Sequence, residues 1–197
     1  MKRTFKFLVP TVEISLVASL CSLLQSILAS NEVSAIAYVF VFCCVWCLGG
    51  GYGEVDGINY KRSFSNWWKE KFKAPRFPTK GSVFDYYVDL ENSTFAEWSN
   101  LANDDFKDQI DTSRAISNYT VPTVDTIGVQ FLMRKLIKVQ HSPMLVGSTG
   151  CGKTQIIKGL LDQLCAGIPG DTDEYLQQII NFNYYTDSTL LQTNLEQ

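Results

Sequence analysis

The stretch Gly147-Ser-Thr-Gly-Cys-Gly-Lys-Thr154 decides how the rest of this sequence is interpreted. It matches the pattern G-x-x-x-x-G-K-[ST] at every fixed position. Glycines reach backbone angles closed to other residues, so successive N–H groups can turn inward and hold phosphate oxygens together with the positive end of a following helix. We therefore predict a phosphate-binding loop made of Gly147, Ser148, Thr149, Gly150, Cys151, Gly152, Lys153 and Thr154. Within it, Lys153 reaches the β- and γ-phosphates, and the Thr154 hydroxyl is the predicted Mg²⁺ ligand.

The residues around this motif have the required strand–loop–helix order. Residues 143–146 form a short apolar run before the loop, and a helical pattern follows to about Cys165. Upstream, Thr123 is a good N-cap for a helix that runs to about Lys138. Downstream, residues 179–183 are expected to form the next strand, and Asp187 or Ser188 to cap a last helix. The predicted fold class is thus α/β, with a truncated P-loop nucleotide-binding domain over residues 121–197.

No catalytic residue can be assigned from the sequence. Hydrolysis needs an acidic residue that supports the metal and a group that positions the attacking water. No apolar run ending in Asp-Asp or Asp-Glu follows the loop, and the downstream acids stand in loop-like sequence: Asp171, Asp173, Glu174 and Asp187. The sequence predicts nucleotide binding without turnover by this stretch alone.

The first 75 residues are expected to form a small helical subdomain. Three helical segments are predicted, at residues 12–30, 33–48 and 58–73, and the second ends at a triple glycine. The first resembles a signal peptide, but Glu13 and Gln25 interrupt it. The second is strongly apolar but shorter than the roughly 20 residues of a membrane-spanning helix, which favours a buried helix.

Residues 76–120 are expected to form a linker and a β-hairpin. Pro75, Pro78 and Gly81 mark the linker. Residues 82–89 alternate apolar and polar side chains, as in a half-buried strand, and residues 94–98 are expected to return as the second strand. The helical subdomain, this hairpin region and the P-loop region are the three predicted domains.

Charge and cysteine usage argue against two other classes of function. The net charge is −3, so no overall positive field favours nucleic acid as a partner. The pair Cys44 and Cys47 has C-x-x-C spacing but lies in an apolar run with no second such pair, which favours buried free thiols over a zinc site. The single histidine, His141, has no neighbouring ligand-type residue in the sequence, so no metal site is expected there.

Three stretches resemble the motor region of dynein heavy chains. Residues 38–50 with Phe64-Ser-Asn-Trp-Trp68 resemble the helical lid that ends the second AAA+ module of such motors. Residues 81–89 with Phe95-Ala-Glu-Trp98 resemble the entry to the third module. Residues 121–126, the phosphate loop and Asn181-Phe-Asn-Tyr-Tyr-Thr186 resemble its nucleotide-binding core. The sequence of residues 181–186 is closer to axonemal, outer-arm-type chains than to the cytoplasmic chain. Cys151 departs from the residue that is usual at its position in the loop.

The resemblance implies a regulatory site for ATP or ADP with Mg²⁺ in a ring of AAA+ modules. It places Val121, Pro122 and Thr123 against the adenine. The implied partners are the other modules of the same heavy chain, dynein intermediate and light chains, and microtubules bound through other regions, with neither nucleic acid nor membrane. The implied location is the axoneme of a cilium or flagellum, with minus-end-directed movement. The resemblance also implies that residue 1 lies inside the second module and that the acidic strand of the third module follows residue 197.

The residues themselves leave two other functions to consider. A stand-alone small P-loop NTPase or kinase-like protein needs its own catalytic acid and base, and none is well placed in this sequence. A membrane-associated protein built on the apolar N-terminal helices needs a longer uncharged span. A non-enzymatic scaffold whose loop binds no ligand is a third possibility. Loss of nucleotide binding on substitution of Lys153 would exclude it.

Overall fold

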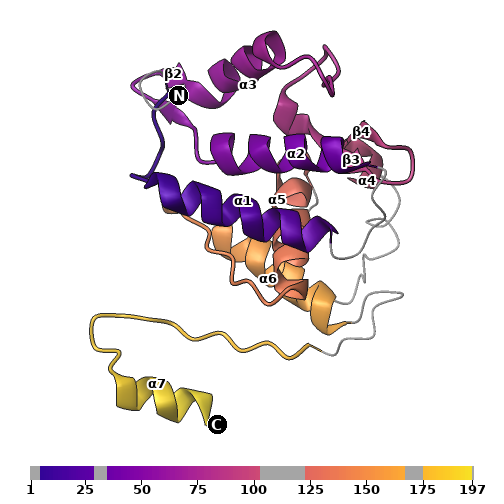
Figure 1. The fold of residues 1–197 in the computed structure, drawn as a ribbon. Helices are drawn as coiled ribbons and strands as arrows, with labels where there is room; N and C mark the ends of the chain where they lie inside the picture. Colours follow the sequence, from indigo (N-terminus) through magenta and orange to yellow (C-terminus); the bar gives the residue numbers. More distant parts are fainter. Residues whose placement is uncertain (1–4, 29–34, 103–122, 167–174, 197) are drawn as a thin grey trace. The chain divides into compact units, whose positions relative to one another are not determined.

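The computed structural model describes residues 5–28, 35–102, 123–166 and 175–196 (Figure 1). The chain divides into two compact units, Met1–Ile157 and Lys158–Gln197, and each is described by itself. Within the described ranges, the first unit contains most of the helices and both small sheets.

The three helices predicted near the N-terminus are present. They are α1 (Glu13–Leu28), α2 (Ile36–Gly49) and α3 (Tyr60–Lys71), each somewhat shorter than expected. Between α2 and α3, β1 (Glu54–Val55) and β2 (Ile58–Asn59) form a small antiparallel hairpin. Its two-residue turn, Asp56-Gly57, has positive φ at both positions, which is the usual geometry for Asp-Gly. Sequence analysis missed this hairpin, although the dipeptide is a recognised signal for it.

Helix α2 lies at the centre of an aromatic core. Its side chains Val39, Phe42, Cys43 and Val45 are almost completely buried, as are Phe64 of α3 and Trp98. Packed aromatic rings surround them, including the edge-to-face pair of Trp46 and Phe84. The predicted buried helix is therefore confirmed. In the described ranges, no helix has the length and apolar character needed to cross a membrane.

The end of α2 shows why glycine is needed at position 49. The helix stops at the triple glycine as predicted, but its C-cap, Gly50, keeps a right-handed conformation (φ −64°). A left-handed cap is therefore not the reason for glycine. A Cβ atom at Gly49 would lie 2.8 Å from Cζ of Phe84 and closer still to the ring of Phe64. Both rings are buried, so neither can move aside cheaply.

Replacing Gly49 with alanine is expected to destabilise the fold by about 1–3 kcal/mol, because the added methyl group overpacks the core. Urea denaturation followed by circular dichroism measures the change. Gly128→Ala is the matched control, because a Cβ atom there meets its neighbours at 3.4 Å or more. Equal stability losses in both variants would contradict the packing explanation.

The predicted hairpin is also present. It consists of β3 (Tyr86–Asp89) and β4 (Thr94–Glu97), paired antiparallel with Tyr86 opposite Glu97, and α4 (Ser99–Ala102) follows. The expected first strand begins later than predicted, because residues Val83–Asp85 form a 3₁₀ turn closed by a capping box between Ser82 and Asp85. As predicted from alternation, Phe84, Tyr86 and Val88 are buried.

The helices expected around the phosphate loop are confirmed. Helix α5 (Val124–Lys138) begins at the predicted N-cap Thr123, whose side chain accepts a hydrogen bond from the N–H of Thr126. Helix α6 (Lys153–Cys165) begins within the loop. In the second unit, α7 (Ser188–Leu195) is capped by Asp187. Because the N-caps of α5 and α7 accept hydrogen bonds from N–H groups at those two helix starts, these two boundaries could be predicted locally.

The two predicted parallel strands are wrong for this structure. Residues 143–146 and 179–183 are not strands, and Met144 and Ile179 are mostly exposed. A strand exists only where a neighbouring strand accepts its backbone hydrogen bonds. The two sheets of the described ranges are both two-stranded and antiparallel, and neither includes these residues. The structure supports the α/β class only as a mixture of helices and short strands.

Candidate nucleotide-binding site

The predicted phosphate loop is described in full and lies between an extended segment and α6. Gly150 and Gly152 have φ of +81° and +84°, a region that L side chains rarely adopt. Helix α6 begins at the next residue, Lys153. The first N–H groups of a helix have no acceptor within the helix, so this end of α6 offers donors and a partial positive charge. The loop residues other than the half-buried Lys153 are exposed.

The side chain of Lys153 folds back across the loop. Its ammonium group donates to the carbonyl oxygens of Gly147 at 2.8 Å and Ser148 at 2.6 Å. It also lies 3.5 Å from Sγ of Cys151. The ammonium group is therefore held against the start of the loop by neutral acceptors. A phosphate oxygen, which carries negative charge, is a stronger acceptor for the same ammonium group.

The space around Gly147 is limited by Cys151. A Cβ atom on Gly147 would lie 3.0 Å from Sγ of Cys151, which is tighter than ordinary contact. A side chain at Gly147 would therefore displace Sγ of Cys151 slightly, whereas Gly150 and Gly152 are favoured by their backbone angles. Cys151 itself is exposed and acts as a small residue within the turn.

One contact that holds α6 was not predicted. The buried side chain of Gln130, on α5, donates from Nε2 to the carbonyl oxygen of Ile156 on α6 at 3.2 Å. Because Ile156 lies in the first turn of α6, this bond positions the helix start that carries the loop. The sequence signal for it is weak, because α5 contains several other polar residues.

The ligand-binding roles of all the predicted site residues remain predictions. Thr154 follows Lys153 in the first turn of α6, with an exposed side chain suited to the Mg²⁺ contact. Thr123 is the N-cap of α5, and Val121 and Pro122 lie outside the described residues. Among the described residues, which include His141, no group of three or more His, Cys, Asp or Glu side chains lies close enough together to hold a metal ion. No catalytic group is identified.

The C-x-x-C pair consists of one buried thiol, Cys44, and one partly buried thiol, Cys47. Cys43, Cys44 and Cys47 are free cysteines within or beside the aromatic core. Burial raises the pKa of Cys47 to about 12 and also raises the pKa of Cys43 and Cys44 above the ordinary value. Metal ligation and redox chemistry need the thiolate form, so these groups act as apolar side chains.

The two halves of the chain match two described parts of one protein family. Residues 1–100 match the dynein heavy chain AAA lid domain, and residues 108–197 match the P-loop containing dynein motor region. The first matched range contains α1, α2 and α3, and the second contains the phosphate loop.

Individual relatives show the same relationship. The chain is 34% identical to human dynein axonemal heavy chain 9, over 100% of this chain and 4% of that protein. It is 32% identical to the flagellar outer arm dynein alpha chain of Chlamydomonas reinhardtii, with the same coverage. It is 33% identical to the ciliary dynein beta chain of Heliocidaris crassispina, over 98% of this chain and 4% of that protein. The chain therefore spans a small part of the length of these relatives, and it belongs to the dynein heavy chain family.

Proposed function

We propose that this chain forms an ATP- or ADP-binding portion of an axonemal dynein motor. The observation that carries the proposal is the loop Gly147–Thr154, in which two glycines with positive φ precede a helix start and Lys153 folds over the loop. This arrangement supplies N–H donors, a helix N-terminus and one ammonium group for the phosphates of a nucleotide.

Each loop residue has a distinct chemical role in the proposal. The backbone N–H groups of residues 148–154 hold the α- and β-phosphates. Lys153 exchanges its carbonyl partners for β- and γ-phosphate oxygens, and the Thr154 hydroxyl binds Mg²⁺. Val121, Pro122 and Thr123 lie against the adenine.

The proposed role within the motor is regulatory. Nucleotide binding at this site modulates a cycle whose main hydrolysis occurs in another module, which fits a loop without an identified catalytic acid. The partners are the other AAA+ modules of the same heavy chain, dynein intermediate and light chains, and microtubules contacted through other regions. The names of the relatives place those proteins in cilia and flagella. We propose the same location for this chain.

The two alternative functions are not favoured. A stand-alone NTPase and a membrane-associated protein both leave the lid match over residues 1–100 unexplained. The absence of a membrane-spanning helix in the described ranges gives the second alternative no support.

Calorimetric titration tests the proposed site. We expect ATP and ADP to bind with one-to-one stoichiometry in the presence of Mg²⁺, and ATP to bind more weakly when EDTA removes the metal. Failure of both nucleotides to bind would contradict the proposed function.

The proposed location has its own test. An antibody raised against residues 85–98 is expected to detect a polypeptide in the axonemal fraction of ciliated or flagellated source cells. A signal confined to fractions free of axonemes would contradict the motor role while leaving nucleotide binding untouched.

A further inference from the structure

Positive charge is concentrated in one short part of the chain. Residues 60–80 contain seven of the 17 lysines and arginines but only one of the 20 acidic residues. The segment therefore carries six net positive charges in a chain whose net charge is −3. It comprises α3 and the loop that follows, within the first unit.

Helix stability accounts for part of this pattern only. Lys69 and Lys71 lie in the last turn of α3, where the helix dipole favours positive charge. Lys61 and Arg62 lie in the first turn, where the dipole disfavours it. Lys73 and Arg76 lie beyond the helix end. Several of the basic residues therefore stand at positions where they do not stabilise the helix.

Acidic neighbours neutralise few of these charges. Lys71 pairs with Glu70 at 2.9 Å, and Lys80 approaches Glu97 at 3.6 Å. In the described part of the chain, no carboxylate lies within 4.0 Å of Arg62, Lys73 or Arg76. Lys73 instead donates to the carbonyl oxygen of Lys69 at 3.3 Å. Among the residues that the structure describes, these three cations are therefore not paired with a carboxylate.

Two of them line a small cleft that lies beside the end of α3. The cleft has a volume of about 170 Å³, and its lining comprises Lys69, Phe72, Lys73, Arg76, Phe77 and Thr79. Every charged residue in this lining is positive. Phe72 is 44% exposed, so an apolar ring stands next to the unpaired cations.

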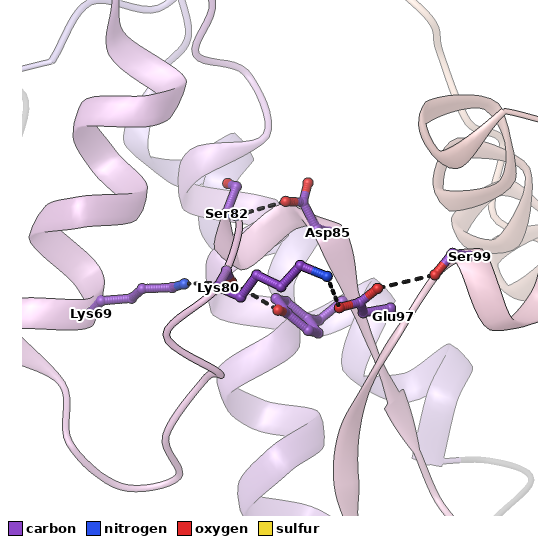
Figure 2. Close-up of polar contacts among 7 residues, drawn as sticks. Lys69, Lys80, Ser82, Asp85, Glu97 and Ser99 are labelled. Atoms are coloured by element: carbon purple, nitrogen blue, oxygen red, sulfur yellow. Dashed lines mark hydrogen bonds and ion pairs between the residues drawn. The ribbon is translucent and has the colours of Figure 1, made fainter.

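The walls of this cleft are held in place by Lys69. Its ammonium group donates to the carbonyl oxygens of Pro78 at 2.6 Å and Gly81 at 2.8 Å, and to those of Thr79 and Lys80 at longer range. Figure 2 shows Lys69 directed toward this loop, which also holds Lys80 beside Glu97. On the inner side, Phe77 stacks on Phe95 with ring centroids 3.9 Å apart. These contacts hold the loop that forms one wall of the cleft.

We propose that this cleft is a docking site for a short acidic segment of another protein. Carboxylates of that segment pair with Lys73 and Arg76, and an apolar side chain beside them lies against Phe72. Lys69 is a positioning residue, because its charge is committed to the loop carbonyls. A short segment fits better than a nucleic acid, because the cations meet at one small cleft, whereas the rest of the chain is strongly negative and repels a long polyanion.

Fluorescence anisotropy with a short labelled peptide of glutamate and phenylalanine tests the proposal on the whole chain. We expect the double variant Lys73→Glu/Arg76→Glu to bind the peptide at least about tenfold more weakly, because two attractive contacts become repulsive. Lys158→Glu reverses the charge of an exposed lysine on α6 and is expected to change affinity by less than about twofold. A peptide with glutamine in place of glutamate is expected not to bind.

Four outcomes would overturn the proposal. The first two are no binding of the acidic peptide to the unmodified chain and an unchanged peptide affinity in the double variant. The third is a loss of peptide affinity in Lys158→Glu that equals the loss in the double variant. The fourth is that the unmodified chain binds a single-stranded oligonucleotide, or vesicles containing phosphatidylserine, more tightly than it binds the peptide.

Nucleotide titration of the double variant shows whether this variant is folded, and its nucleotide affinity is expected to match that of the unmodified chain. If it does not bind nucleotide, Arg76→Gln replaces it, with a smaller loss of peptide affinity expected. Failure of this cleft is thus distinguishable from failure of the phosphate loop.

Discussion

Replacing Lys153 with alanine is expected to weaken Mg²⁺-ATP binding by about a hundredfold or more. The ammonium group lies over the loop, within 2.8 Å of two carbonyl oxygens that a phosphate would replace. Hydrogen bonds to charged groups contribute about 1.5–3 kcal/mol each, and every 1.4 kcal/mol corresponds to a factor of ten. Loss of contacts to two phosphates therefore gives the expected effect. Titration with a fluorescent ATP analogue measures it.

Lys158→Ala is the matched control for this substitution. Lys158 lies later on α6 and is exposed, so its removal deletes the same charge from the same helix without touching the loop. We expect its affinity for nucleotide to stay within about twofold, since exposed charges at this distance are largely screened. Similar losses in both variants would show that general charge, rather than the loop contact, governs binding.

Replacing Trp98 with alanine is expected to reduce the free energy of unfolding by about 3–5 kcal/mol. Trp98 has no exposed surface, and its ring contacts those of Tyr87 and Phe131 at centroid distances of 5.2 and 5.3 Å. Its Nε1 group donates to the carbonyl oxygen of Phe84 at 2.9 Å. The substitution therefore leaves a large cavity and an unpaired buried carbonyl group. Urea denaturation of the whole chain measures the loss.

A second aromatic truncation, at an exposed position, serves as the control for burial. Phe40, on α2, is half exposed, so Phe40→Ala is expected to cost much less than Trp98→Ala. A loss below about 1 kcal/mol for Trp98→Ala, or equal losses in the two variants, would contradict the central position of Trp98 in the core.

Local signals made much of the helical structure predictable. The apolar run of α2, the N-cap Thr123 and the cap Asp187 each act within a few residues, so their effect can be read from neighbouring positions. The glycine turn and the helix start at residues 147–154 were predictable for the same reason, because the glycines and the first residues of α6 are consecutive in the sequence.

Long-range contacts were not predictable. The strand expected at residues 143–146 depends on neighbouring strands, and the described sheets provide none for it. The four carbonyl partners of Lys69 belong to backbone groups, which have no residue-type signal. The bond from Gln130 to Ile156 joins two helices and depends on how they pack. The basic segment at residues 60–80 was visible in the sequence, but its cleft required the fold.

Hydrogen–deuterium exchange with and without ADP and Mg²⁺ tests the central claim most directly. If the nucleotide phosphates occupy the loop, the backbone N–H groups of residues 148–154 become hydrogen-bond donors to the ligand, and their exchange slows. We predict that this slowing is strongest in the loop and the first turn of α6, and that it disappears in Lys153→Ala. Unchanged exchange across these residues at saturating nucleotide, or slowing confined to other parts of the chain, would contradict the assignment of the site.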